Sequence, residues 1–373
     1  MVPPHASFGT VDAVRREAEA LAQRAASGGQ KVCGWLGVGS PVELIDAAGL
    51  LPMELSAAGA HATPLADEYM EDLFDPVVRG VFERLLRGEF SYLSAIVLPR
   101  SGDSVHRFYY YLCELKRAGI ANLPEPILFD CLQAQGEPSN NYTRDRLQEF
   151  YGKLATVFGR KADEVELAAA MQRASERSEG LQQFARRRRS GTLTAEEALA
   201  TYAAARMLPH DEFLARTSTV PAGNAASAPR NAPRIVIAGS PHDDAGLHRA
   251  IEQAGGQVVG DFHAAGELSI GASPGRDIDT LLDYYRTRWT PRSFGDPAER
   301  LLTFAREANA DAVLFSYFPV EEALTWDYPA QAAALSANDI ATLRLPDQMR
   351  PYDTGAAVAQ LSAFIANLSM RRK

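Results

Sequence analysis

Long apolar runs, closely spaced cysteines and an excess of positive charge are all missing from this chain of 373 residues. No apolar stretch approaches the roughly 20 residues of a membrane-spanning helix, and the N-terminus lacks the apolar core of a secretory signal. The net charge of −9 gives a general nucleic-acid or anionic-membrane role no support. Three cysteines without close spacing argue against a disulfide scaffold and fit a reducing compartment. We therefore expect a cytoplasmic protein with no nucleic-acid and no membrane partner.

The order of apolar and amphipathic segments predicts two α/β domains. In residues 1–141, strand-like and helix-like segments alternate, which is typical of a parallel sheet covered by helices. Residues 142–216 have helical spacing without strand patterns, so we expect a helical segment that bridges the domains. A small, polar, proline-containing linker is expected at 217–233. A second alternating pattern fills 234–373, so the architecture of the first domain should be repeated there.

One strand–turn–helix segment is a candidate ligand site, because open α/β sheets bind ligands at such turns. The apolar run 95–98 leads into the turn 99–104, and an aromatic helix follows. We expect Arg100, Ser101, Gly102 and Asp103 to form one rim of a substrate site, where the planar guanidinium of Arg100 can pair with a carboxylate or a phosphate. A helix cap supplied by Asp103 or Ser104 is the alternative interpretation.

A second turn, residues 37–40, precedes a helix that should begin near Pro41. Gly37 and Gly39 permit positive φ and close approach of a ligand to the backbone. The free N–H groups at the helix start suit an anion or a carbonyl oxygen, so we include Gly37, Gly39 and Ser40 among the substrate-binding candidates. A structural turn is the equally good alternative, in which Ser40 is the N-cap and Glu43 completes a capping box.

Four stretches, in order, resemble the 2-hydroxyacyl-CoA dehydratase/benzoyl-CoA reductase family. They are KVCGWLGVGSPVELIDAAGLLPMEL, LLRGEFSYLSAIVLPRSGDSVHRFYYYL, RIVIAGSPHDDAGLHRAIEQAGGQVVGDF and DPAERLLTFAREANADAVLFSYFPVEEALTWDYPAQAAAL. The resemblance implies two flavodoxin-like or Rossmann-like domains facing a shared cleft, an acyl-CoA thioester substrate and a homologous second subunit in a heterodimer or homodimer. It also implies a 4Fe–4S cluster held by three cysteines and reduced by a separate ATP-hydrolysing activase.

The positions at which the resemblance places the cluster cysteines hold other residues. They fall in the turn 37–40, at Gly102 and near 319–321, where this chain has no cysteine. Iron in such clusters needs thiolates that converge on one pocket. Cys33 should lie inside a strand and Cys113 far along a helix, and only Cys131 follows a strand end. We therefore expect no cofactor and no metal in this chain, with a 4Fe–4S cluster possible in a partner subunit.

Further candidates lie outside these two turns. Glu43, His61 in a loop of small residues and Glu321 near the third empty cysteine position are the candidate acid–base groups. Ser240, in a Gly/Ser-containing turn after a strand, is a candidate for binding substrate. The acidic start of the following helix explains His242 to Asp244 better than a metal site does. The basic run 186–189 is expected to be a solvated helix end rather than a phosphate site.

Two functions follow from these observations. In the first, the chain is a subunit of a heteromeric 2-hydroxyacyl-CoA dehydratase or benzoyl-CoA reductase-like enzyme, and it shapes the acyl-CoA cleft or the interface without a cluster of its own. In the second, the same scaffold has been repurposed, either as a binding protein or as an enzyme of non-redox chemistry at the interdomain cleft. The sequence favours the first, since heterodimeric families tolerate one member without a cluster.

Overall fold

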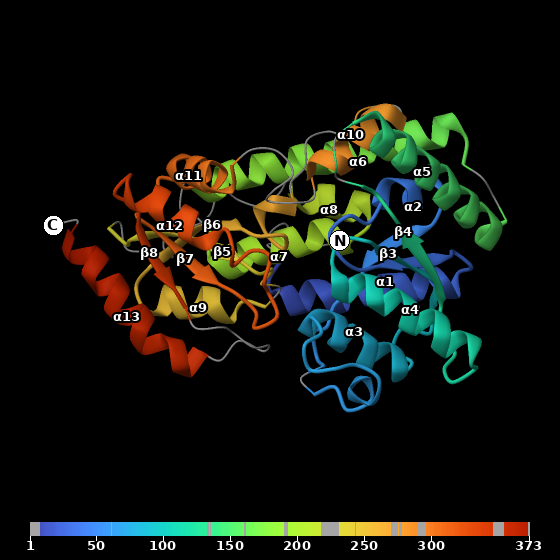
Figure 1. Ribbon diagram of the computed structural model, residues 1–373, viewed down its shortest axis with the longest axis horizontal. Coiled ribbons are helices and arrows are strands. Elements are labelled where there is room, and N and C mark those ends of the chain that lie inside the picture. The colour runs from blue at the N-terminus through green and yellow to red at the C-terminus, as the bar shows by residue number, and fades with distance from the viewer. Residues whose placement is uncertain are drawn as a thin grey trace.

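Two four-stranded parallel sheets form the centre of the molecule (Figure 1). The computed structural model describes residues 8–371 except 61, 133, 135, 160–161, 190–192, 218–230, 243, 270–274, 276–277, 289–295 and 346–353. The strand order is β2-β1-β3-β4 in the first sheet and β6-β5-β7-β8 in the second. The strands are β1 (Val32–Trp35), β2 (Leu51–Glu54), β3 (Leu93–Pro99), β4 (Glu125–Phe129), β5 (Arg234–Gly239), β6 (Gln257–Phe262), β7 (Ala312–Ser316) and β8 (Ala341–Arg344). The predicted α/β class and the repeated architecture are confirmed.

Helices connect and cover the strands as the alternating pattern predicts. Those of the first half are α1 (Val11–Ser27), α2 (Val42–Ala47), the 3-10 turn η1 (Ala66–Glu68), α3 (Pro76–Leu86), α4 (Asp103–Arg117), α5 (Glu137–Phe158), α6 (Glu164–Arg189), α7 (Ala195–Met207) and α8 (His210–Thr217). Those of the second half are α9 (Gly246–Gln253), η2 (Glu267–Ser269), α10 (Ile278–Arg288), α11 (Pro297–Glu307), α12 (Tyr328–Ser336) and α13 (Thr354–Arg371). Within the described residues, none of these helices combines the length and the apolarity that crossing a bilayer requires.

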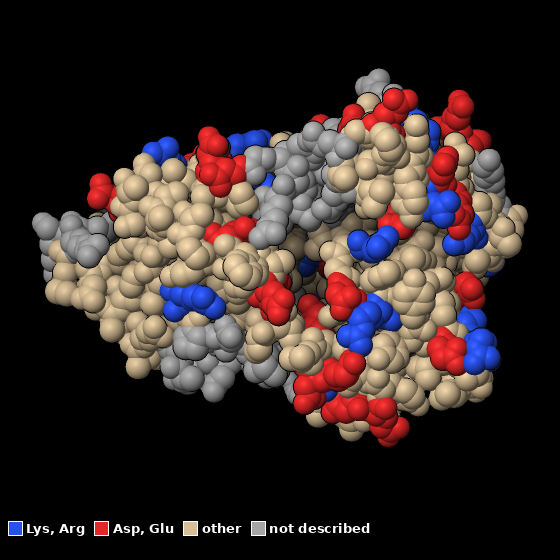
Figure 2. Space-filling model, viewed as in Figure 1, with Lys and Arg blue, Asp and Glu red and all other residues tan. Residues whose placement is uncertain are grey.

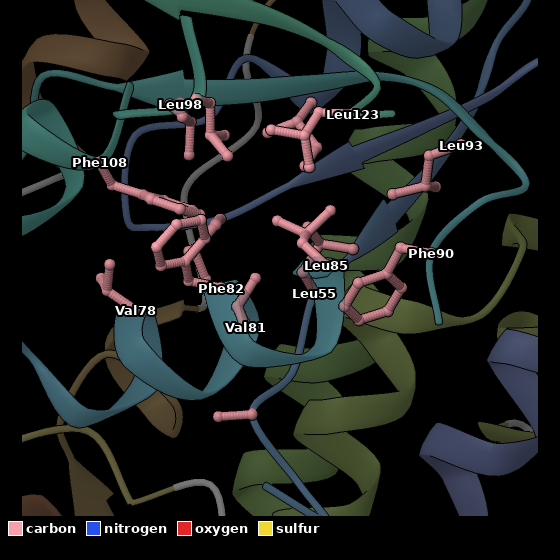
Figure 3. Close-up of a cluster of buried hydrophobic side chains, with 14 of the residues drawn as sticks. Leu55, Val78, Val81, Phe82, Leu85, Phe90, Leu93, Leu98, Phe108 and Leu123 are labelled. Carbon is pink, nitrogen blue, oxygen red and sulfur yellow. The ribbon is translucent and has the colours of Figure 1, made fainter. Parts of the chain in front are cut away.

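Both faces of the first sheet are buried, which explains why its central strand reads as an apolar run. On one face, Ile96 and Leu98 of β3 pack against side chains of α3 and α4 such as Phe82 and Phe108, whose ring centroids lie 5.4 Å apart (Figure 3). On the other face, the neighbouring β3 residues pack against α2, α5 and α10. Alternate side chains of one strand therefore hold two helical layers in place.

The helix α10 lies on the first sheet, although its sequence follows the second sheet's β6 (Figure 1). Leu281, Leu282 and Tyr285 are buried against that sheet, and the Tyr285 and Phe129 ring centroids are 5.6 Å apart. The predicted second domain, 234–373, thus contributes a helix to the core of the first. No local pattern in the sequence encodes this crossing.

The helices α5 to α8 occupy most of residues 137–217, where the sequence predicts a helical segment. Along its length α6 contacts α2 of the first domain and β6 of the second. Helix α1 packs against α7 in a separate apolar cluster. Helix α5 begins at Glu137, a few residues before the expected boundary at 142. Most of the expected linker, 218–230, lies outside the described residues.

The basic end of α6 is not the solvated helix end that its sequence predicts. Arg188 is 1% exposed, and its Nη1 lies 2.8 Å from Asp261 Oδ2 at the end of β6. Arg189 pairs with Glu267 at 3.3 Å and with Glu307 at 3.1 Å. The prediction was wrong because these arginines meet carboxylates of the second domain, which neutralise them inside the protein.

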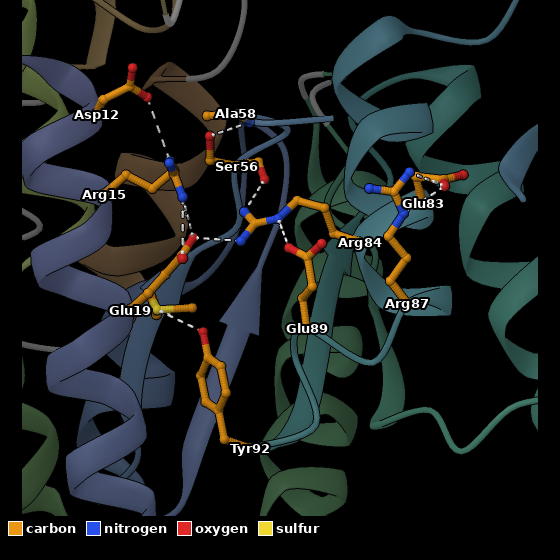
Figure 4. A network of polar contacts seen from close by, with 11 residues as sticks. Asp12, Arg15, Glu19, Ser56, Ala58, Glu83, Arg84, Arg87, Glu89 and Tyr92 are labelled. Carbon is orange, nitrogen blue, oxygen red and sulfur yellow. Dashed lines mark hydrogen bonds and ion pairs between the residues drawn. The ribbon is translucent and has the colours of Figure 1, made fainter. Parts of the chain in front are cut away.

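Arg84 links α3 to three other segments of the first domain (Figure 4). Its guanidinium donates to the carbonyl oxygen of Ser56 at 2.8 Å and pairs with Glu19 of α1 at 2.9 Å and with Glu89 at 2.6 Å. It also lies over the ring of Phe90, at 4.4 Å from its centroid. Because Arg84 is only 5% exposed, these partners replace the water that the charge would otherwise bind.

We expect Arg84→Met to lower the free energy of unfolding by about 2–4 kcal/mol. The variant leaves Glu89 and the Ser56 carbonyl without their cationic partner, and it leaves Glu19 with Arg15 alone. Urea denaturation followed by circular dichroism measures the change. Arg117→Met is the matched control, since Arg117 makes an exposed pair with Glu114 and its loss should leave the unfolding curve unchanged. Equal stability of Arg84→Met and the parent would contradict the role given to the network.

Candidate functional site

A cavity of about 800 Å³ lies between the two sheets and the bridging helices. The space-filling view shows a hollow between the two lobes, with charged side chains around it (Figure 2). The first domain contributes Gly37, Ser40, Glu43, Ser101 and Gly102 to its wall, and the second contributes Glu321. The three turns at which the resemblance places cysteines therefore converge on one cavity. This follows from the fold, because the carboxyl ends of parallel strands meet at one edge of each sheet.

The turn after β1 needs its glycines. Gly37 and Gly39 have φ of 97° and 109°, values that side-chain-bearing residues rarely adopt. The hydroxyl of Ser40 donates to the carbonyl oxygen of Gly37 at 3.1 Å, and α2 begins at Val42 with Pro41 at the N-cap. The alternative capping box of Ser40 and Glu43 is therefore wrong. Gly37 and Ser40 line the cavity, and Gly39 is not among its lining residues.

Glu43 is held by a side chain from the other half of the sequence. The phenol of Tyr285 on α10 donates to Glu43 Oε2 at 2.5 Å, and both residues are buried. A buried carboxylate needs such a donor, because transfer from water removes its hydration. Glu43 also faces the cavity, so a hydrogen-bonded carboxylate is available to a ligand there.

The turn after β3 contributes uncharged residues to the cavity wall. Ser101 and Gly102 line it, while Gly102 is the N-cap of α4 without a side-chain cap. The alternative interpretation, a cap by Asp103 or Ser104, is wrong. The Asp103 side chain is 84% exposed, and the Ser104 hydroxyl instead accepts a hydrogen bond from the Asp75 N–H at 3.1 Å.

Arg100 is not brought to the cavity with its neighbours. Its Nη1 lies 3.3 Å from Asp130 Oδ2, just after β4, and neither Arg100 nor Asp103 is among the cavity-lining residues. Successive side chains at the end of a strand point to opposite faces, which separates Arg100 from Ser101.

In the second domain, Glu321 faces the cavity and Ser240 does not. Burial raises the pKa of Glu321, the Leu324 N–H that donates to its Oε1 at 3.1 Å opposes the rise, and nearby Asp75 reinforces it. Ser240 is buried, and its hydroxyl accepts a hydrogen bond from the Phe318 N–H at 2.9 Å. Asp244 accepts from the Gly246 N–H at the start of α9, while Asp243 and the candidate His61 lie outside the described residues.

The three cysteines do not offer a converging set of thiolates. Cys33 is fully buried in β1, burial raises the pKa of its thiol far above the ordinary value, and it packs with core residues. Cys113 lies on α4 beside Tyr109, and Cys131 follows β4. None of the three is among the cavity-lining residues. Their arrangement does not fit the thiolate set that a 4Fe–4S cluster needs.

One group of potential metal ligands does come together in the described part of the chain: His248, Asp261 and His263. Asp261 Oδ1 lies 2.8 Å from His248 Nε2, and its Oδ2 pairs with Arg188. Although burial opposes ionisation, Arg188 and His248 hold the pKa of Asp261 well below its usual range. The charge of this carboxylate is therefore already balanced by a guanidinium, and the group serves as a buried ionic link.

The bridging helices supply cavity residues that the sequence analysis missed. Arg173 and Arg177 of α6 and Arg206 of α7 all line the cavity. Burial lowers the pKa of Arg177 to about 10, so its guanidinium stays charged at neutral pH. Helical spacing indicated these helices, but the face turned toward the cavity depends on how both domains pack on them.

The comparisons with known proteins agree with this architecture. The family model for 2-hydroxyglutaryl-CoA dehydratase, D-component, matches residues 38–368. The chain belongs to this family. It is also similar to the beta subunit of (R)-2-hydroxyglutaryl-CoA dehydratase from Acidaminococcus fermentans, with 20% identity over 356 residues. That alignment covers 91% of this chain and 93% of the relative. The resemblance found in the four sequence stretches is thus confirmed at the level of the family.

The two glycine turns should respond differently to substitution. Gly37→Ala should lower the free energy of unfolding by roughly 1–2 kcal/mol, because φ is positive and a Cβ would lie 3.3 Å from Pro99 and Val105. Gly102→Ser should change stability by less than about 0.5 kcal/mol, since φ is −169° and a Cβ there meets nothing within 4 Å. Paired urea titrations test the contrast, and equal losses would show that the turns are misassigned.

Glu321→Gln should be more stable than the parent at neutral pH but not in acid. A folded-state pKa above the unfolded value means that stability is retained below the unfolded pKa and lost as pH rises through the folded pKa. The advantage of the Gln variant should therefore grow from about pH 4.5 upward and then level off. Denaturation at a series of pH values measures it, with Glu322→Gln at the exposed neighbouring position as the control. A difference independent of pH would contradict the assignment.

Proposed function

We propose that this chain is a subunit of a heteromeric acyl-CoA enzyme of its family, and that it binds a CoA thioester in the interdomain cavity without a cluster of its own. One observation carries the proposal: the three turns that converge on the cavity offer glycine, hydroxyl and carboxylate groups instead of thiolates. The scaffold that positions these turns is complete. The cluster, where the enzyme has one, belongs in this proposal to a homologous partner, and an activase supplies the electron.

The cavity residues have distinct roles in this proposal. The positive-φ turn at Gly37 and the exposed backbone at Gly102 let the thioester approach main-chain N–H groups, with Ser40 and Ser101 beside them. Glu43, oriented by Tyr285, accepts or returns a proton at the acyl group. Glu321 holds a proton more readily than an exposed carboxyl does, which suits a donor. We assign the chain to the cytoplasm, as its cysteine usage indicates.

A second function is favoured by the pair Glu43 and Glu321. These carboxyl groups face one cavity from opposite domains, and the raised pKa of Glu321 differentiates it as a proton donor. Two carboxyl groups in different environments are the usual means of general acid–base catalysis. The alternative is therefore a repurposed scaffold that carries out non-redox chemistry on its own.

Anaerobic purification with and without the homologous partner separates these functions. For the subunit, we expect no iron or sulfide in the single chain, iron in the pair, and binding of an acyl-CoA by calorimetry. The absorbance of a 4Fe–4S cluster in the single chain would exclude a cluster-free role. A pair that has neither iron nor affinity for acyl-CoA would remove the first function. Conversion of a thioester by the single chain in air would support the second.

A further inference from the structure

The three arginines that the bridging helices contribute to the cavity differ in how their charge is balanced. Arg173 Nε lies 2.8 Å from Asp46 Oδ2, and Arg206 Nε lies 2.7 Å from Glu54 Oε2. In the described part of the chain, no carboxylate lies within ion-pairing distance of Arg177. A charge removed from water is normally paired, so Arg177 stands apart from its neighbours.

The hydrogen bonds of Arg177 occupy only one side of its guanidinium. Nη1 donates to the carbonyl oxygens of Ala205 at 2.5 Å and Leu208 at 3.2 Å, and Nη2 donates to the same Leu208 oxygen at 3.2 Å. The two Nη atoms therefore share the carbonyl oxygen of Leu208, which lies at the end of the guanidinium opposite to Nε. The parallel N–H groups of Nε and the outer edge of Nη2 make no hydrogen bond in the described residues. That edge is the fork that binds a carboxylate or a phosphate bidentately.

The surroundings of Arg177 compensate its charge only in part. Ala205 and Leu208 belong to the C-terminal end of α7, where the helix dipole provides roughly half a negative charge. The two acidic groups that act electrostatically on Arg177 make direct contacts elsewhere, Asp46 with Arg173 and Glu43 with Tyr285. Burial and Arg177 itself lower the pKa of His210, so this histidine adds no second cation at neutral pH. Within the described residues, the guanidinium of Arg177 is therefore influenced by these carboxylates at a distance and has no direct ion pair of its own.

We propose that Arg177 is the anion-binding residue of the cavity and that it holds a carboxylate or a phosphate group of the bound ligand. The inference rests on the proposed binding of a CoA thioester, which carries phosphates on its nucleotide and can carry a carboxylate on its acyl chain. The anion supplies at Arg177 the direct ion pair that Asp46 supplies at Arg173 and Glu54 supplies at Arg206. Because Arg177 belongs to α6, the bound anion contacts the helix that packs against both domains.

Calorimetry on the full chain with four probes tests this assignment. The probes are a CoA thioester and a pantetheine thioester of the same neutral acyl group, a pantetheine thioester with a terminal carboxylate, and inorganic phosphate. Arg177→Met should weaken the anionic probes by roughly 10- to 100-fold and leave the neutral pantetheine thioester unchanged. If Arg177→Met loses affinity for the CoA thioester, the group that Arg177 binds is a phosphate. If it loses affinity for the carboxylate probe, the group is the carboxylate of the acyl chain.

Two controls guard against a merely structural effect. The double variant Arg173→Met/Asp46→Asn removes an arginine one helical turn away together with the carboxylate that pairs with it. The net charge of the cavity wall is kept, so this variant should not discriminate between anionic and neutral probes. Arg177→Lys keeps the charge but loses the fork, and it should restore part of the affinity. Equal weakening of anionic and neutral probes by Arg177→Met, or no weakening at all, would overturn the inference.

Failure of the proposed function gives a different pattern. If the parent protein binds no thioester, that function is wrong, and phosphate binding then decides the role of Arg177 alone. Phosphate affinity that is lost in Arg177→Met supports the anion site. Phosphate affinity that is absent in the parent, or equal in both proteins, refutes it.

Discussion

The buried ion pair of Arg188 and Asp261 determines where the bridging helix lies against the second sheet. Both side chains are almost completely withdrawn from water, at 1% and 0% exposure, so the pair is stable only while its geometry is held. His248 and Glu267 supply the further contacts that a buried charge pair needs. In its N-terminal half α6 is fixed by the pair of Arg173 with Asp46 and by packing on α2. The cavity wall between these two anchors is therefore set by ion pairs at two points along one helix. Arg177, about 16 Å from Arg188 along the helix axis, lies on that wall.

The fold was predictable because its information is local. Strands buried on both faces give short apolar runs, and the helices between them show their own spacing, so the two sheets could be inferred from alternation alone. The convergence of Gly37, Gly102 and Glu321 was predictable for the same reason, since each follows the carboxyl end of a strand. The crossing of α10 and the burial of Arg188 were not, because each depends on a partner far along the chain. A basic helix end looks the same in sequence whether water or Asp261 neutralises it.

The candidate residues show how far a motif can be trusted. Ser101 and Gly102 were correctly expected to lie at the cavity edge, but Arg100, in the same motif, points to Asp130. Ser240 follows a strand as expected, yet its hydroxyl serves the backbone of Phe318. Glu43 has the spacing of a capping box, whereas its carboxylate accepts from Tyr285. A motif therefore locates a turn reliably, and it leaves the direction of each side chain to the packing around it.

The residues that line the cavity suggest why thiolates are missing from it. Space does not explain the glycine at 102, since a Cβ there meets nothing within 4 Å and the backbone is extended. A side chain would fit, so the scaffold itself does not exclude a thiolate.

The acidic groups around the cavity provide a different constraint. Glu43, Asp75 and Glu321 all face it, and the Asp75 charge contributes to the raised pKa of Glu321. Three converging thiolates would add further negative charge beside these carboxyl groups, in a site where burial already disfavours ionisation. The carboxyl groups instead suit moving a proton, whereas the guanidinium of Arg177, which has no ion pair within the described residues, suits binding an anionic group. These charges agree with the proposed subunit, in which this chain binds the thioester and a partner carries out electron transfer.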